Sequence, residues 1–315
     1  MATSTIQVAE MAIATFAAAG IASYLVLKLT NGSRSEESKY NYHPYPRTTF
    51  LQNDRTIIPN DDAVLAQPRG WSMEDALKSA KDGSARAKAM TPAQVLQSLQ
   101  KGNSRFWTGQ AQRPEVSAFE RRVLIKQQFP STAILGCSDS RVPVEIVFDQ
   151  GLGDMFVVRV AGNCLGPTTQ ASLDYAVHHL SVKVLMIMGH EGCGAIKAAG
   201  LPQEMINKET KSLSAMLTNL KTALSEVQKI ADPRALDREC VVSNVRRQVT
   251  DIVKDPQLME SIKSGNLIIV GAFYEISSGI VDFFMQVSKF DGKDKKPSPG
   301  VQSRYFPETG EIVQV

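Results

Sequence analysis

The sequence STAILGCSDSRVP spans residues 131–143, and VKVLMIMGHEGCGA spans residues 182–195. Each stretch contains a short apolar run that is followed at once by Gly, Cys and charged residues. A run of about four to eight apolar residues is typical of a strand that is buried on both faces of a parallel sheet. Both stretches therefore predict a buried strand, over residues 132–135 and 184–188, with chemically reactive side chains directly after its carboxyl end.

Two further runs of the same kind extend the predicted sheet. They cover residues 155–160 and 267–271. Segments with helical spacing lie between the runs, over residues 170–180, 195–200, 213–229 and 236–253. Strands that alternate with helices in this way are typical of an α/β fold with right-handed crossovers.

The sequence after residue 272 predicts antiparallel strands at an edge of this sheet. FYEISSGIVDFF (273–284) alternates on both sides of Ser277, Ser278 and Gly279, which is a hairpin signal. RYFPETGEIVQV (304–315) predicts a second hairpin after a charged linker. We therefore predict an α/β fold with a mostly parallel β-sheet, an antiparallel edge and flanking helices.

The chain divides into four parts on this pattern. They are an apolar N-terminal segment over 1–30, a tether with an N-terminal helix over 31–90, a catalytic domain over 91–288, and a C-terminal extension over 289–315. Thr91 and Pro92 are typical of the cap and first turn of a helix, which we expect to end at Gly102.

Residues 11–27 (MAIATFAAAGIASYLVL) contain no charged residue. The first ten residues contain no Lys or Arg, which argues against a secretory signal, and the first 30 contain no Arg, which argues against a transit peptide. An uncleaved membrane anchor over residues 11–29 fits better, with Lys28, Arg34 and Lys39 on the side that carries the rest of the chain. The alternative is an Ala-rich helix that packs against a partner.

The composition excludes several classes of protein. The 315 residues include 35 Lys and Arg against 32 Asp and Glu, which gives a net charge of +3. This balance predicts no binding to nucleic acid, because such proteins carry clustered positive charge in excess. The hydrophobic fraction of 43% is that of a globular chain. Four Cys are too few for a disulfide-built scaffold, so each is interpreted from its surroundings.

Cys137, His190 and Cys193 are candidate metal ligands. They follow two of the predicted strands, and the carboxyl ends of parallel strands are where ligands bind in such sheets. Two thiolates and one imidazole leave one tetrahedral position open, which is typical of a catalytic zinc site. The alternative is that the cysteines are small buried apolar side chains. Cys164 and Cys240 have no His or Cys at ligand spacing, so we predict that neither binds the metal.

Asp139 and Arg141 lie two residues apart, just after Cys137. A bidentate pair with arginine would keep the carboxylate ionised and oriented beside the metal. From there the carboxylate would either coordinate the metal or accept a hydrogen bond from a hydroxide on it. The alternative is a weak surface ion pair.

GCSDSRVP, FVVRVAGN and DYAVHHLSVKVLMIMGHEGCGA, in this order, resemble the β-class carbonic anhydrases. The resemblance runs from Thr91 to Phe284, and the combination C-x-D-x-R with a later H-x-x-C-G is highly specific. It implies an enzyme that converts carbon dioxide to bicarbonate and a proton by attack of a zinc-bound hydroxide. It also implies a homodimer, or a higher homo-oligomer, that forms through swapped N-terminal helices. By position, the zinc ligands are Cys137, His190 and Cys193, and the catalytic dyad is Asp139 and Arg141.

The resemblance assigns further residues to the substrate pocket. Gln128 matches a glutamine whose amide binds carbon dioxide or bicarbonate, and Phe156, Tyr175 and Gly194 match other pocket positions. His179 matches a proton shuttle proposed in plant-type members, which this site resembles. The alternative is that His179 only packs.

Three positions depart from the usual pattern of the family. Val160 replaces a frequent Asn, and Glu191 replaces a small residue after the ligand histidine. Ile134 stands where a bicarbonate-inhibited subtype has Trp, which argues against that form of regulation.

Two other functions share these ligands. One is a hydrolase of carbon disulfide or carbonyl sulfide, and the other is a non-catalytic assembly protein with a structural zinc. Thiolate ligands are sensitive to oxidation, so we expect a reducing compartment. Together with the anchor, this predicts a membrane-associated protein of a plastid, a mitochondrion or the cytoplasmic face of a membrane.

Overall fold

A computed structural model places the larger part of the chain. It describes residues 73–112, 121–122, 124–125, 127–225, 227, 230–289, 295–307 and 309–314. The chain separates into two units, 1–60 and 61–315, and every described residue belongs to the second. None of the helices among these residues has the length and apolar character that a membrane crossing requires. The predicted anchor over residues 11–29 and the tether as far as residue 72 lie outside the described residues.

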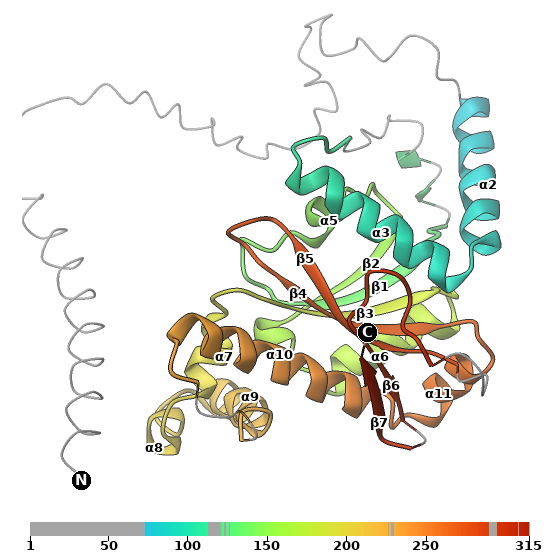
Figure 1. Cartoon of the computed structure of the whole chain (residues 1–315). Coiled ribbons are helices and arrows are strands. Elements are labelled where there is room, and N and C mark those ends of the chain that lie inside the picture. The colour runs from blue at the N-terminus through green and yellow to red at the C-terminus, as the bar shows by residue number, and fades with distance from the viewer. Residues whose placement is uncertain are drawn as a thin grey trace, which may run out of the picture. The chain divides into compact units, whose positions relative to one another are not determined.

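The described strands form one twisted sheet in the order β2-β1-β3-β4-β5-β6-β7 (Figure 1). Their bounds are β1 Thr132–Gly136, β2 Met155–Arg159, β3 Val184–His190, β4 Ile268–Tyr274, β5 Val281–Val287, β6 Ser303–Phe306 and β7 Glu311–Gln314. Strands β2, β1, β3 and β4 are parallel, whereas β5 is antiparallel to β4 and β7 is antiparallel to β6. The predicted fold class, a mostly parallel sheet with an antiparallel edge, is confirmed.

Strand β4 differs from the sequence prediction. We expected separate strands over 267–271 and in the first half of the hairpin, but β4 runs without interruption to Tyr274. All seven of its residues are buried, and it pairs with β3 as far as His190. The prediction of a new strand after Ala272 is therefore wrong. The segment 273–274 continues β4, whose two faces are both covered.

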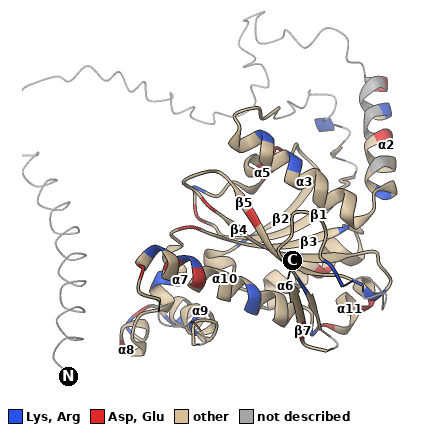
Figure 2. Cartoon of the chain, viewed as in Figure 1, with Lys and Arg blue, Asp and Glu red and all other residues tan. Residues whose placement is uncertain are grey.

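Helices cover both faces of the sheet (Figure 1). On one face lie α3 (Pro92–Trp107) and α5 (Val144–Val147), which follow α2 (Met73–Ala89) along the chain. The other face carries α6 Pro167–His178, α7 Gly194–Ala199, α8 Gln203–Ile206, α9 Lys211–Thr222, α10 Pro233–Ile252 and α11 Pro256–Lys263. Strands β1, β3 and β4, between these layers, contain no Lys, Arg, Asp or Glu (Figure 2).

Two helices end five or more residues away from the predicted position. Helix α9 ends at Thr222 and not at residue 229, and the next carbonyl, that of Ala223, accepts a hydrogen bond from the Ser243 hydroxyl at 2.6 Å. Helix α3 begins as predicted, with a capping box between Thr91 and Gln94, but it continues past Gly102 to Trp107.

Gly102 is a packing position and not a helix end. A Cβ atom at this residue would lie 2.0 Å from the backbone oxygen of Phe148, so only glycine lets α3 approach the end of α5 this closely. The neighbouring Asn103 is buried and ties the same region together. Its amide donates to the carbonyls of Val147 at 3.1 Å and Gly279 at 2.9 Å, and its oxygen accepts from the Val281 N–H at 2.9 Å.

We expect Gly102→Ala to lower the free energy of unfolding by at least about 2 kcal/mol, because the added methyl group forces α3 away from α5. Urea unfolding followed by circular dichroism measures the effect. Gly83→Ala is the matched control, since a Cβ on this α2 glycine meets no described atom within 4 Å, and there the helix gains up to about 1 kcal/mol. Equal stabilities of the two variants would contradict this account of Gly102.

Candidate metal centre

The candidate ligands meet because of how β1 and β3 pair. Cys137 directly follows β1, and His190 is the last residue of β3. The two strands are parallel neighbours, with Leu135 opposite Ile187, so their carboxyl ends lie side by side. Cys193 then caps the start of α7, three residues after His190.

Cys137, His190 and Cys193 each offer one ligand atom, and these atoms all lie within 4.8 Å of one another. The three side chains are buried, which fits a metal held inside the protein. Among the residues that the structure describes, these three are close enough together to bind one metal ion.

His190 is oriented for metal binding. Its Nδ1 lies 2.9 Å from the carbonyl oxygen of Glu191, and because a carbonyl can only accept, Nδ1 must carry the proton. The lone pair of the neutral ring is then on Nε2. This atom is buried and has no hydrogen-bond partner among the described residues. An unpaired buried nitrogen is costly unless something binds it, so its position fits a metal cation.

The thiol of Cys137 is predisposed to ionise. A hydrogen bond from the Cys193 thiol is the main reason that the pKa of Cys137 is well below its usual range, and the backbone N–H of Gly162 also points at its sulfur, 3.3 Å away. The same contact with Cys137 raises the pKa of Cys193. Cysteine binds a metal as the thiolate, so a cation bound at this site would displace the thiol protons.

A buried chain of amides supports the Gly162 N–H. The Asn244 amide donates to the Gly162 carbonyl at 3.0 Å, and the Gln248 amide donates to Asn244 Oδ1 at 3.0 Å. The Leu165 N–H completes the chain by donating to Gln248 Oε1 at 2.9 Å. Sequence reasoning missed Asn244 and Gln248. The signal was present, because they are two amides four residues apart on a face of α10 that otherwise consists of valine and isoleucine.

Asp139 and Arg141 form the predicted bidentate pair. Arg141 donates from Nε to Asp139 Oδ1 at 2.9 Å and from Nη2 to Oδ2 at 2.7 Å, and its backbone N–H also reaches Oδ1 at 2.9 Å. These bonds hold the pKa of Asp139 well below its usual range, so the carboxylate is ionised. Asp139 Oδ2 lies 3.9 Å from His190 Nε2 and therefore beside the space between the three ligands.

Arg159, which lies in the FVVRVAGN motif, also supports the site. Its guanidinium donates from Nε to the Cys137 carbonyl at 2.9 Å and from Nη2 to the Asp139 carbonyl at 2.6 Å. The arginine therefore fixes the backbone of the segment that carries one ligand and the carboxylate. It stands at the end of β2, the strand next to β1.

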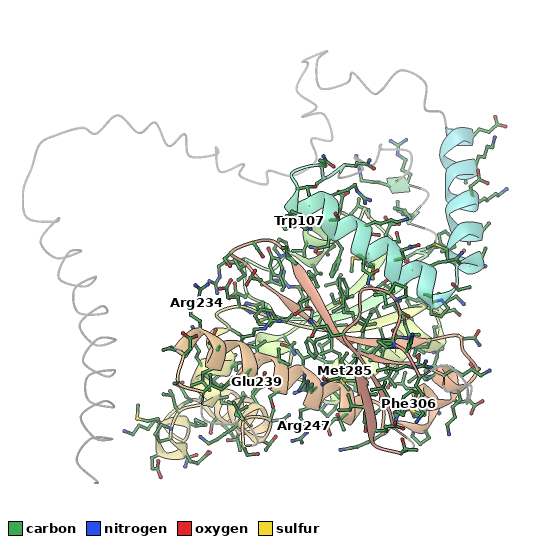
Figure 3. The ribbon with its side chains drawn as sticks, in the orientation of Figure 1. Trp107, Arg234, Glu239, Arg247, Met285 and Phe306 are labelled. Carbon is green, nitrogen blue, oxygen red and sulfur yellow. The ribbon has the colours of Figure 1, made fainter. Side chains whose placement is uncertain are left out.

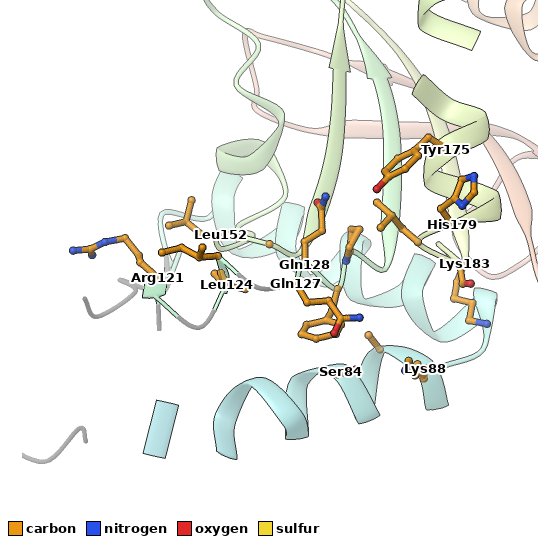
Figure 4. A pocket seen from close by; sticks show the side chains of 17 residues that line it. Ser84, Lys88, Arg121, Leu124, Gln127, Gln128, Leu152, Tyr175, His179 and Lys183 are labelled. Carbon is orange, nitrogen blue, oxygen red and sulfur yellow. The ribbon is translucent and has the colours of Figure 1, made fainter. Parts of the chain in front are cut away.

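The predicted pocket residues are divided between the two ends of the sheet. Gly194 begins α7 at the metal end. Gln128, Tyr175 and His179 instead line a cavity of about 1140 Å³ that also includes Lys183 (Figure 4). The rings of Tyr175 and His179 are stacked, with centroids 5.1 Å apart, and the Phe156 ring is 6.0 Å from that of Tyr175.

This cavity lies at the amino end of the parallel strands. Gln128 precedes β1, and Lys183 directly precedes β3. A strand rises about 3.3 Å per residue, so the five residues of β1 separate this end from Cys137 by about 17 Å. Within one chain, Gln128 and the candidate ligands therefore do not meet.

Comparison with known proteins gives a consistent result. The family model described as carbonic anhydrase matches residues 132–281. Carbonic anhydrase 2 of Mycobacterium tuberculosis is 33% identical over 199 residues, which cover 60% of this chain and 90% of the relative. The carbonic anhydrase of Mycolicibacterium smegmatis is 32% identical over 203 residues, which cover 61% and 92%. A crystal structure of a tetrameric β-carbonic anhydrase from Sordaria macrospora is 28% identical with a TM-score of 0.47, over 52% of this chain and 84% of the other.

Proposed function

The chain belongs to the β-class carbonic anhydrases, and from this premise we propose that it hydrates carbon dioxide at a zinc ion held by Cys137, His190 and Cys193. The observation that carries the proposal is the set of three buried ligand atoms within 4.8 Å of one another. Three protein ligands are the number that catalytic zinc sites have, and zinc held by these residues would supply a Lewis acid for the activation of water.

Zinc in such a site lowers the pKa of a water molecule to about 7, which makes a nucleophile available at neutral pH. Asp139 would accept a hydrogen bond from this nucleophile through Oδ2, the oxygen that lies 3.9 Å from His190 Nε2. Arg141 holds the carboxylate ionised and aimed, so Asp139 presents a lone pair and no proton to the nucleophile. This hydrogen bond would orient the nucleophile toward the carbon of carbon dioxide.

We place the substrate pocket between two subunits. Two apolar residues that line the cavity around Gln128 are exposed to solvent. Ile125 is 81% exposed and Leu152 is 60% exposed. A two-fold dimer would cover these side chains and set the amino end of one sheet against the metal end of the other. Gln128 of the partner subunit would then donate its amide N–H to an oxygen of carbon dioxide or bicarbonate.

The first experiment is stopped-flow hydration of carbon dioxide by the purified full chain, with zinc measured per chain. We expect turnover that scales with zinc content. Protein that holds stoichiometric zinc and does not accelerate hydration would contradict the proposed function.

A mixture of two variants tests the shared pocket. We expect Gln128→Ala and Asp139→Asn each to reduce hydration strongly, and mixed dimers of the two to recover activity. In a mixed dimer one pocket carries both substitutions and the other carries neither, so activity approaches half that of the wild type. Dimers with the two chains tagged differently can be purified after refolding together. If mixed dimers are as inactive as the single variants, Gln128 does not serve the partner's site.

A further inference from the structure

The turn that carries two of the three ligands contains two glycines, Gly192 and Gly194, that add no side-chain packing to it. We call this turn, residues 190–194, the ligand loop. Gly192 adopts a positive φ of 67°, and a Cβ atom on Gly192 or Gly194 would meet no described atom within 4 Å. Between the buried His190 and Cys193, hydrogen bonds to neighbouring segments fix the loop.

The Glu191 backbone links the His190 ring to the sheet. Its carbonyl oxygen lies 2.9 Å from His190 Nδ1, and its N–H donates to the Tyr274 carbonyl at 2.9 Å. A shift of the Glu191 backbone would therefore move the carbonyl that accepts from His190 Nδ1. That carbonyl sets the orientation of the imidazole, with Nε2 available to the metal. Partners of this kind, bonded to the far nitrogen of a metal-binding histidine, affect metal affinity strongly.

The Glu191 side chain anchors the same backbone to a segment that is distant in the sequence but adjacent in the fold. Its Oε2 accepts a hydrogen bond from the Ser277 N–H, in the turn between β4 and β5, at 3.0 Å. This bond is the main reason that the pKa of Glu191 is lowered. Its Oε1 lies 3.6 Å from Nη2 of Arg234, which projects outward at the start of α10 (Figure 3). The arginine side chain is 83% exposed, so this ion pair contributes little beside the hydrogen bond.

Asp237 holds the same loop from the other side. Its Oδ2 accepts from the Gly192 N–H at 3.1 Å. The ligand loop is thus fixed by two carboxylates, one that reaches out of the loop to the β4–β5 turn and one that reaches in from α10. A residue with a short side chain at position 191 would leave the Ser277 N–H without this partner and the loop with a single carboxylate contact.

We propose that Glu191 is a positioning residue for the metal, which fixes the ligand loop against the β4–β5 turn and so aims His190 Nε2 at the ion. The proposal rests on the proposed zinc function, and it concerns metal affinity and geometry, which can be measured without turnover. Glu191 lies outside the group of three candidate ligands.

Glu191→Ala in the full chain tests the proposal. We expect the zinc dissociation constant, measured by competition with a fluorescent chelator, to rise about 10-fold or more. In the cobalt(II)-substituted protein we expect the visible absorption bands to shift or weaken, because the imidazole is aimed less well. Glu191→Gln keeps an oxygen that accepts from the Ser277 N–H, so we expect this conservative variant to bind zinc within about 3-fold of the wild type.

Two controls separate this effect from general damage. Arg234→Ala removes only the exposed ion pair, and we expect wild-type zinc affinity. Glu275→Ala removes a carboxylate of the same turn, one that accepts from the Ser278 hydroxyl at 2.5 Å, and we also expect wild-type affinity. Zinc affinity and a cobalt spectrum in Glu191→Ala that match the wild type would overturn the proposal, as would equal losses in Glu191→Ala and Glu275→Ala. A wild-type protein that binds zinc without hydrating carbon dioxide would instead contradict the proposed function, and the effect of Glu191 on zinc affinity would still be measurable.

Discussion

We expect Asp139→Asn to reduce kcat/KM for carbon dioxide hydration at least about 100-fold, the range lost when a positioned proton acceptor is removed. Asparagine has one acceptor oxygen and one NH2 group. Both carboxylate oxygens of Asp139 accept from the Arg141 guanidinium, so an amide in this place sets a donor against a donor. The side chain must rotate or lose a bond, and it no longer offers an ionised oxygen to the nucleophile.

Zinc content separates this effect from loss of the metal. The proposed ligands are untouched in Asp139→Asn, so we expect stoichiometric zinc with little turnover. Asp154→Asn is the matched control, because Asp154 accepts a backbone N–H in a turn, at 2.9 Å from the Gly151 nitrogen, away from the ligands. We expect this control to keep wild-type kcat/KM. Wild-type activity in Asp139→Asn would show that its carboxylate has no part in the reaction.

The centre of the sheet and the ligand set were predictable from the sequence because both depend on local pattern. The apolar runs before Gly136 and Gly189 are short and uninterrupted, which is typical of strands covered on both faces. Once β1 and β3 are parallel neighbours, Cys137 and His190 must lie at the same edge. Asp139 and Arg141 are two residues apart, so their pairing is also a local matter.

The contacts that support the site were not predictable in the same way. Gln248 meets Leu165 across 83 positions of the chain, and Glu191 meets Ser277 across 86. Glycine is typical of a helix end, yet the role of Gly102 is set by the carbonyl of Phe148, which is 46 residues away in the sequence. Such pairs depend on how helices and loops far apart in the sequence pack together, and single-sequence periodicity carries no record of that packing.

The division of the pocket could have been inferred. Gln128 is nine residues before Cys137, and the strand between them is extended. The two ends of an extended strand are separated by about 3.3 Å per residue, so the residues at its two ends cannot contact one substrate within a single chain. A motif shows which residues take part in a site, but it does not show which subunit supplies each of them.

We expect Cys193→Ser to weaken zinc binding by more than about 100-fold, because the loss of a ligand must exceed the 10-fold to 100-fold cost of losing a residue that only supports one. Hydration of carbon dioxide should fall to the uncatalysed rate. Only two ligands, Cys137 and His190, would remain, and catalytic zinc sites have three. A serine hydroxyl does not replace the lost ligand, because it does not ionise at neutral pH as a metal-bound thiol does. Zinc content after gel filtration and stopped-flow hydration measure the two losses.

Cys164→Ser is the matched control for this prediction. Cys164 is also buried, and its sulfur accepts from the Asn219 amide at 3.4 Å, but it lies outside the group of ligand atoms. A metal that binds only the folded chain raises its melting temperature by mass action. Added zinc should therefore raise the melting temperature of the metal-depleted wild type and of Cys164→Ser, and leave that of Cys193→Ser unchanged. If zinc stabilises Cys193→Ser as much as Cys164→Ser, the ion binds elsewhere, and the unpaired Nε2 of His190 must be satisfied by something other than a metal.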